Sequence, residues 1–325
     1  MKRRTFIAGL GSAAAWPAVA RAQQQAVPVV GYLHLSRLRQ DELSAFQKGL
    51  SELGFVEHRN VAIEYRWADD EYTRLPELAA DLVRRRVAVI AAFGTALAAK
   101  AATATIPVVF LTGVDALETG MVASLSRPGG NVTGINSMNT GVGLGIKRLG
   151  LLHELVPRAM RFGLLVQSNI SSSSLQLTVA EVQRAAASIG RPLEILSANT
   201  NREIDAAFAS LAQKRVDAVM VAPTYLFNNR RIQLAMSGVR YAVPMIFPER
   251  RDAEVGGLMS YGPDWTELNR QVGIYVGRIL KGDKPGELPV QQPTKFEFII
   301  NAQTARLMGI EVPATLLATA NEVIE

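Results

Sequence analysis

The sequence predicts an α/β protein with two similar lobes, each formed by a mostly parallel sheet flanked by helices. Three observations support this prediction. First, the uninterrupted apolar run Val87–Phe93 is short for a helix and indicates a strand buried on both faces, as in a parallel sheet. Second, strand-like runs alternate with amphipathic helical stretches, as in right-handed βαβ units. Third, the order repeats, because 216–222 corresponds to the first run and 243–247 corresponds to 106–110.

The first half of the chain alternates predicted strands with predicted helices. Leu43, Phe46 and Leu50 recur at helical spacing and indicate an amphipathic helix, which Gly54 is placed to end. The run at 87–93 stops at Gly94, and an alanine-rich helical stretch follows it. We expect strands at 27–33, 61–67, 87–93, 106–111 and 132–136, and helices at 43–53, 75–83, 96–104 and 116–125.

The second half repeats this alternation and then continues. Thr200 and Glu203 form a capping box at the start of one helix, and Gly190 closes another helix as Gly54 does in the first half. We expect strands at 162–166, 193–196, 216–222, 243–247, 257–262, 288–293 and 296–300. Helix faces are predicted within 146–156, 179–189, 204–211, 268–279 and 302–308.

The chain is expected to cross between the lobes more than once. We assign 27–138 and 257–285 to the first lobe, and 142–254 and 288–325 to the second. The glycine-rich run 141–145 lacks both the Lys-Ser/Thr ending of a phosphate loop and a preceding strand, so we interpret it as a joint between lobes. Hinges are expected near 136–145 and 254–257.

Residues 1–22 have the pattern of a cleaved export signal. A basic head is followed by the apolar stretch Phe6–Val19 and by Ala20-Arg21-Ala22, a typical cleavage site. Arg3 and Arg4 also fit a twin-arginine signal, and both export routes remain open. We expect a mature protein in the periplasm. It would have no lipid anchor, because the chain contains no cysteine, and no membrane-inserted segment after cleavage.

Composition excludes several functional classes. The net charge is +6, but the expected signal carries four positive charges and no acid, which leaves +2 for the remainder. This balance gives no electrostatic argument for binding nucleic acid. The three histidines (His34, His58 and His153) have no metal-type spacing, and no nucleophile elbow, P-loop or H-E-x-x-H motif occurs. We therefore expect no metal, no cofactor and no enzymatic activity, although a secreted enzyme on an α/β scaffold is an alternative.

Polar and aromatic residues follow the predicted strands in both halves. The carboxyl ends of parallel strands meet at one edge of a sheet, so these residues outline a ligand cleft between two lobes. Each residue alone has an alternative interpretation as a solvated loop or cap residue. The candidate ligand-binding residues are Ser36, Gly94, Thr95, Asp115, Ser168, Asn169, Thr224, Tyr225, Glu249 and Tyr261.

The residue types in this set favour a small charged ligand. Hydroxyls and helix N-termini suit a carboxylate, and Asp115 or Glu249 would suit an ammonium group. Aromatic residues at the same strand ends would enclose an apolar or aromatic side chain, or would equally belong to the core. Those aromatic residues are Tyr225, Phe227, Tyr261 and Trp265.

Several segments resemble the bacterial ABC-transporter substrate-binding proteins of the tryptophan/tyrosine type. They are 60–68 (NVAIEYRWA), 74–83 (RLPELAADLV), 123–134 (ASLSRPGGNVTG), 256–262 (GGLMSYG), 270–282 (RQVGIYVGRILKG) and 292–301 (QPTKFEFIIN). The resemblance implies a two-lobed periplasmic-binding-protein (type I) fold, a ligand in the cleft and delivery to a membrane permease. Carried onto this sequence, the family's binding loops fall at the candidate residues given above. The loops depart from the family pattern where Asp115 is followed by Ala116 instead of proline, and at Gln167–Ile170.

Two functional hypotheses share this fold. The first is the solute-binding component of an ABC importer that captures an amino acid or an aromatic carboxylate and acts as a monomer. The second is a ligand-sensing periplasmic subunit of a membrane receptor. A repressor with two such lobes would need a helix-turn-helix before the first lobe, where this chain has the expected export signal.

Overall fold

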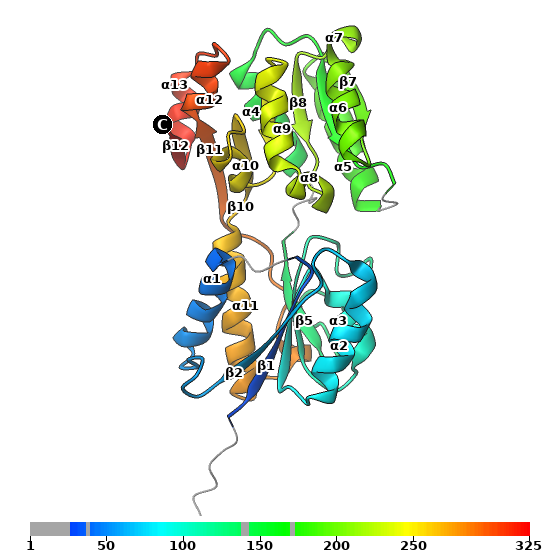
Figure 1. Cartoon of the computed structure of the whole chain (residues 1–325), viewed down its shortest axis with the longest axis vertical. Helices are drawn as coiled ribbons and strands as arrows, with labels where there is room; N and C mark the ends of the chain where they lie inside the picture. The colour runs from blue at the N-terminus through cyan, green and yellow to red at the C-terminus, as the bar shows by residue number, and fades with distance from the viewer. Residues whose placement is uncertain (1–26, 37–39, 138–142, 170–172) are drawn as a thin grey trace, which may run out of the picture.

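The computed structural model describes residues 27–36, 40–137, 143–169 and 173–325. Two lobes lie end to end, and each consists of a twisted sheet between layers of helices (Figure 1). This arrangement confirms the two-lobed α/β class expected from the sequence. The expected export signal at 1–22 lies outside the described residues. Among the described helices, none has the length and apolarity needed to cross a membrane.

The first lobe contains a five-stranded, fully parallel sheet in the order β2-β1-β3-β4-β5. Its strands are β1 (Val29–His34), β2 (Ala62–Trp67), β3 (Val89–Phe93), β4 (Val108–Thr112) and β5 (Val132–Asn136). Every residue of β3, β4 and β5 is buried. Because helices cover both faces of this sheet, its strands β3 and β4 consist of nearly continuous apolar runs.

Two helices cover each face of the first sheet. On one face α2 (Leu75–Arg84) and α3 (Ala96–Ala102) bury side chains such as Leu82 and Ala99. On the other face α1 (Gln40–Glu52) packs against α11 (Trp265–Leu280), a helix from far along the chain (Figure 1). The short 3₁₀ helix η1 (Tyr72–Arg74) precedes α2.

Glycines allow α1 and α11 to approach closely. A Cβ atom on Gly273 of α11 would lie 2.1 Å from the carbonyl oxygen of Phe46, and one on Gly49 of α1 would lie 1.9 Å from that of Arg270. No real Cβ atom fits at such distances, so only glycine permits this packing. The contact attaches α11 firmly to the first lobe.

The second lobe contains a seven-stranded sheet in the order β12-β11-β10-β9-β8-β6-β7. Its strands are β6 (Phe162–Val166), β7 (Leu193–Ser197), β8 (Ala218–Val221), β9 (Met245–Phe247), β10 (Met259–Pro263), β11 (Phe296–Asn301) and β12 (Glu322–Ile324). All neighbours are parallel except β10 and β11, which pair antiparallel. The helices are α4 (Leu144–Leu155), α5 (Ser173–Ser188), α6 (Asn201–Ala209), α7 (Leu211–Lys214), α8 (Tyr225–Asn229), α9 (Arg231–Arg240), α10 (Arg250–Glu254), α12 (Ala302–Leu307) and α13 (Ala314–Thr319).

The structure differs from the expected lobe assignment at the crossings. We expected 257–285 in the first lobe, but β10 pairs with β9 and β11 in the second sheet, and only α11 belongs to the first lobe. The chain therefore crosses between Pro263 and Trp265, not at the expected hinge 254–257, which lies inside the second lobe. Periodicity predicted the strand and the helix but carries no information on which sheet a strand joins.

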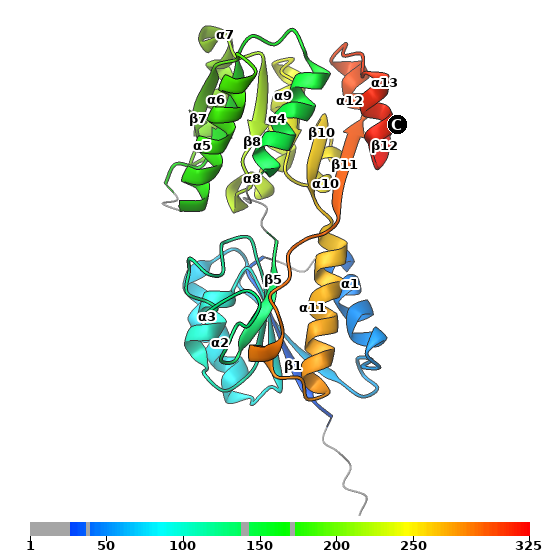
Figure 2. The same ribbon diagram turned by 180° about the vertical axis from the view of Figure 1, so that it is seen from behind.

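The last crossing also lies later than expected. We placed 288–325 in the second lobe with a strand at 288–293. Instead, the 3₁₀ helix η2 (Pro285–Glu287) and the residues after it remain on the first lobe, where Gln291 N–H donates to the Gly134 carbonyl at 3.0 Å. The chain then passes to β11, and Figure 2 shows this connection beside the one from β10 to α11. Residues 138–142 of the other expected hinge are outside the described residues, and Gly143, with φ +97°, precedes α4.

Candidate functional site

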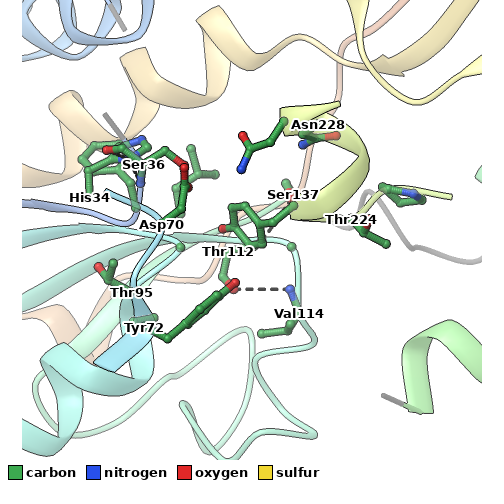
Figure 3. Close-up of a pocket in the computed structure, with 18 of the residues that line it drawn as sticks. His34, Ser36, Asp70, Tyr72, Thr95, Thr112, Val114, Ser137, Thr224 and Asn228 are labelled. Carbon is green, nitrogen blue, oxygen red and sulfur yellow. Dashed lines mark hydrogen bonds between the residues drawn. The ribbon is translucent and has the colours of Figure 1, made fainter. Parts of the chain in front are cut away.

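A cavity of about 1190 Å³ lies between the two lobes. Its walls are formed by the segments that follow strands of both sheets and by the first turn of α11. Figure 3 shows residues from both lobes around it, including His34, Ser36 and Thr112 from the first and Asn228 from the second. Of the ten candidate residues, six line this cavity: Ser36, Gly94, Thr95, Thr224, Tyr225 and Glu249.

The first-lobe wall is built from the turns after β3 and β4. The Thr95 hydroxyl donates to the Leu33 carbonyl at 3.1 Å, which ties the turn after β3 to β1. The Thr112 hydroxyl accepts the Val114 N–H at 3.3 Å, and the Ser137 hydroxyl donates to the Thr112 carbonyl at 3.1 Å. These bonds hold the turn after β4 in place. Figure 3 shows Thr112 and Ser137 at this wall of the cavity.

An acidic segment after β2 adds to the same wall. Asp69 and Asp70 have φ of +53° and +65°, and the Ser36 hydroxyl donates to Asp70 Oδ1 at 2.6 Å. Burial, with the nearby charge of Asp70, raises the pKa of the Tyr72 phenol. Our sequence reasoning missed Asp70 and Tyr72, although they follow a predicted strand as the other candidates do.

The second-lobe wall presents Glu249 as its buried carboxylate. Glu249 is 4% exposed and precedes α10, and its Oε1 accepts a hydrogen bond from Asn228 Nδ2 at 2.8 Å. Thr224 begins α8, where its hydroxyl accepts the Phe227 N–H at 3.2 Å. Phe227 itself is buried in the core and takes no part in the cavity wall.

Charged groups surround Glu249, and one of them, Arg231, also lines the cavity. Asp252 is 2% exposed, its Oδ2 accepts the Glu249 N–H at 3.1 Å, and its Oδ1 lies 3.6 Å from Arg231 Nε. Burial and the neighbouring Glu249 raise the pKa of Asp252 to about 8. Burial lowers the pKa of Arg148 to about 10, so this guanidinium remains charged at neutral pH. The wall around Glu249 thus contains both signs of charge.

The two lobes touch across the cavity. A Cβ atom on Gly94, whose φ is +67°, would lie 2.1 Å from the Tyr225 hydroxyl of the other lobe. The Tyr225 ring meets the Tyr72 ring edge-on, with centroids 6.2 Å apart. Arg251 of α10 reaches α1, where Nη1 donates to Glu42 Oε1 and Nη2 to Asp41 Oδ2, both at 2.8 Å. These contacts hold the lobes together over the cavity.

The first turn of α11 contributes two polar side chains to the cavity. Asn269 is 1% exposed, and its Nδ2 donates to the Trp265 carbonyl at 2.8 Å. Both residues line the cavity. Our sequence reasoning considered Trp265 only as a ring, and missed Asn269, because the register of α11 against the cavity depends on the chain crossing.

Four candidate residues lie away from the cavity. Asp115 is exposed and its Oδ1 accepts the backbone N–H groups of Leu117 and Glu118, so it caps its own turn. Ser168 and Asn169 are exposed and bond to Asn199. Tyr261 stacks on Phe296 within β10 and β11. Within the described part of the chain, no group of three or more His, Asp or Glu side chains is placed to hold a metal ion.

Comparisons with known proteins place the chain beside solute-binding proteins. The family model described as "ABC transporter substrate binding protein" matches residues 34–324. A curated "Tyrosine-binding protein" of Clostridioides difficile (strain R20291) is 27% identical over 269 residues, which cover 82% of this chain and 76% of the relative.

Solved structures share the fold over most of the chain. A Streptococcus pneumonia ABC domain in complex with L-Trp superposes with a TM-score of 0.81 at 24% identity, covering 91% of this chain and 99% of the other. A conserved domain protein of Vibrio cholerae gives 0.80 at 23% identity, with the same coverage. The ligand-free, open structure of a substrate binding protein with adhesive properties from Clostridium difficile gives 0.72 at 23% identity, covering 92% and 99%.

Proposed function

Because the chain belongs to the family of ABC transporter substrate binding proteins, we propose that it captures an aromatic amino acid between its lobes and delivers it to the permease of an ABC importer. We further propose that it does so in the periplasm, after removal of the export signal. Two similar proteins, a tyrosine-binding protein and an ABC domain in complex with L-Trp, support this choice of ligand class.

The observation that carries the proposal is the placement of Glu249. Its carboxylate is almost fully buried at the cavity wall and is oriented by Asn228. A ligand ammonium group at this carboxylate would form a charge-assisted hydrogen bond, which is stronger than a neutral one. Glu249 therefore provides the binding group for an α-amino group.

Hydroxyls around the cavity provide for the ligand carboxylate. Thr112 and Thr224 use their hydroxyl oxygens to accept backbone N–H groups, so each O–H hydrogen remains available as a donor. Thr112 belongs to the first lobe and Thr224 to the second. An amino acid held by donors from both lobes, and by Glu249, favours the closed form through contacts that the open form lacks.

Calorimetric titration of the purified protein with amino acids and their deaminated analogues tests the proposal. We expect an aromatic amino acid to bind and its analogue without the amino group to bind at least about tenfold more weakly, because the analogue cannot form the charge-assisted hydrogen bond to the Glu249 carboxylate. This comparison needs no variant. Failure of every amino acid in the panel to bind would overturn the proposal.

Glu249→Gln tests the same contact from the protein side. We expect binding of the amino acid to weaken about tenfold or more, while binding of the deaminated analogue changes little. Glu254→Gln is the matched control, since Glu254 ends the same helix and pairs with Arg250 outside the cavity wall. Equal losses for the amino acid and its analogue would indicate a structural effect of the substitution and contradict the assigned role.

A further inference from the structure

Two buried polar atoms at the hinge end of the cavity have no hydrogen-bond partner within the described chain. They are the indole nitrogen Nε1 of Trp265, a donor, and the amide oxygen Oδ1 of Asn269, an acceptor. Leaving such groups buried and unpaired costs free energy, so a site that retains them points to a partner from outside the protein. Both side chains line the cavity.

The helix fixes the orientation of both side chains. Trp265 and Asn269 are four residues apart on α11 and lie on the same face, where side chains are neighbours. Asn269 Nδ2 donates to the Trp265 carbonyl, so the amide nitrogen is committed and Oδ1 is the atom left as acceptor. The two unpartnered atoms thus belong to neighbouring side chains on one face of α11, and both of these residues line the cavity.

Apolar side chains pack against Trp265. Trp265 packs against a core cluster that contains Phe93 and Leu111, and both of these also line the cavity. The cavity wall at Trp265 therefore combines a hydrophobic surface with one hydrogen-bond donor and one acceptor, and charged residues such as Glu42 and Arg251 line the same cavity. Such a wall suits an aromatic ring that ends in a single small polar group.

We propose that Trp265 and Asn269 select a ligand whose aromatic side chain ends in a hydroxyl. This inference rests on the proposed function, and it adds which chemical group ends the aromatic side chain of the ligand. A hydroxyl both donates and accepts, so one group satisfies Asn269 Oδ1 and Trp265 Nε1 together. An indole N–H satisfies only Asn269, and a plain phenyl ring satisfies neither, so both leave buried polar atoms unpaired.

The experiment compares tyrosine, phenylalanine and tryptophan by calorimetric titration of the wild-type protein. We expect tyrosine to bind about tenfold or more tightly than phenylalanine, with tryptophan weaker than tyrosine as well. Equal binding of tyrosine and phenylalanine would overturn this inference while the proposed function stands. Absence of binding by any amino acid would overturn both.

Variants locate the selectivity on α11. Trp265→Phe and Asn269→Leu together remove both polar atoms, and we expect the ratio of tyrosine to phenylalanine affinity to fall toward one because phenylalanine no longer leaves them unpaired. Gln271→Met is the matched control, since Gln271 Oε1 on the same helix is also buried and unpartnered among the described residues but lies outside the cavity wall. This control should keep the wild-type ratio. A ratio unchanged in the double variant would contradict the role of the pair.

Discussion

At the scale of single residues, Asp252 links the buried charges beside Glu249 to pH. Burial and the Glu249 carboxylate raise the pKa of Asp252 from its ordinary value of 3.8 to about 8. The folded protein therefore holds this proton more tightly than the unfolded chain. The resulting contribution to stability is complete below about pH 4 and is lost as the pH rises toward 8.

We therefore expect Asp252→Asn to flatten the dependence of stability on pH. The wild-type protein should lose stability relative to this variant as the pH is raised from 5 to 8, because the Asp252 carboxyl is ionised in the unfolded chain but still protonated in the folded protein. Thermal unfolding of both proteins across this range, without ligand, provides the measurement. Parallel curves for the two proteins would contradict the assigned protonation of Asp252.

Single residues of the cavity wall differ in how well the sequence predicts them. Glu249, Thr224 and Gly94 were predictable as cavity residues because each directly follows a buried parallel strand, and such ends must face the cleft. Asp115 met the same criterion yet caps its own turn. Asn269 does not follow a strand, and its position in the cavity wall depends on how the whole helix α11 is rotated. Position along a strand is encoded locally, whereas side-chain direction after the strand is not.

At the scale of elements, the packing of α1 on α11 is the contact that positions the hinge end of the cavity. A Cβ atom on Gly273 would lie 2.1 Å from the Phe46 carbonyl oxygen and 2.9 Å from the Leu50 nitrogen. Both are backbone atoms of a helix, which cannot move aside as a flexible side chain would. The helices would have to separate, and Trp265 and Asn269 would move with α11.

We expect Gly273→Ala to destabilise the protein by about 1–3 kcal/mol through overpacking. Urea unfolding followed by circular dichroism measures this change. Gly150→Ala in α4 is the matched control, because a Cβ atom there meets nothing within 4 Å and alanine favours helix by about 0.5–1 kcal/mol. Destabilisation by both substitutions alike would refute the explanation by close helix approach.

Element order was more predictable than element partnership. The strand at 257–262 and the helix after it were recognisable from apolar spacing. In the structure Asp264 caps α11 by accepting the Glu267 N–H at 2.9 Å. Their membership of different lobes was not recognisable, since β10 pairs with strands on both sides only once the second sheet has formed. Pairing between distant segments is a property of the assembled sheet.

At the scale of the whole molecule, closure depends on few contacts between the lobes. Among the described residues, Arg251 forms a charged link between the lobes, and its side chain is 12% exposed while that of Glu42 is 10% exposed. Replacing Arg251 removes both of its hydrogen bonds to α1 from a position poorly exposed to water, where charge-assisted bonds are stronger than at an exposed site. Opening the lobes rehydrates both groups, so the loss of one partner penalises the closed form in particular.

We expect Arg251→Met to shift the ligand-free protein toward the open form. If only the closed form holds ligand with full affinity, the apparent affinity falls in proportion to the closed fraction, and we expect a loss of about tenfold. Small-angle X-ray scattering should show a larger radius of gyration without ligand, and a return to the wild-type value at saturating ligand.

The adjacent arginine separates closure from lobe stability. Arg250 forms ion pairs with Glu254, Glu297 and Glu322, all within the second lobe. Arg250→Met should therefore lower thermal stability while leaving the radius of gyration and the ligand affinity near their wild-type values. Arg251→Met could instead lower only the thermal stability, which is the result expected for Arg250→Met. In that case the ion pair from Arg251 to α1 would have no part in closure. The lobes would then be held by the Tyr225 contact with Gly94 and by the ligand itself.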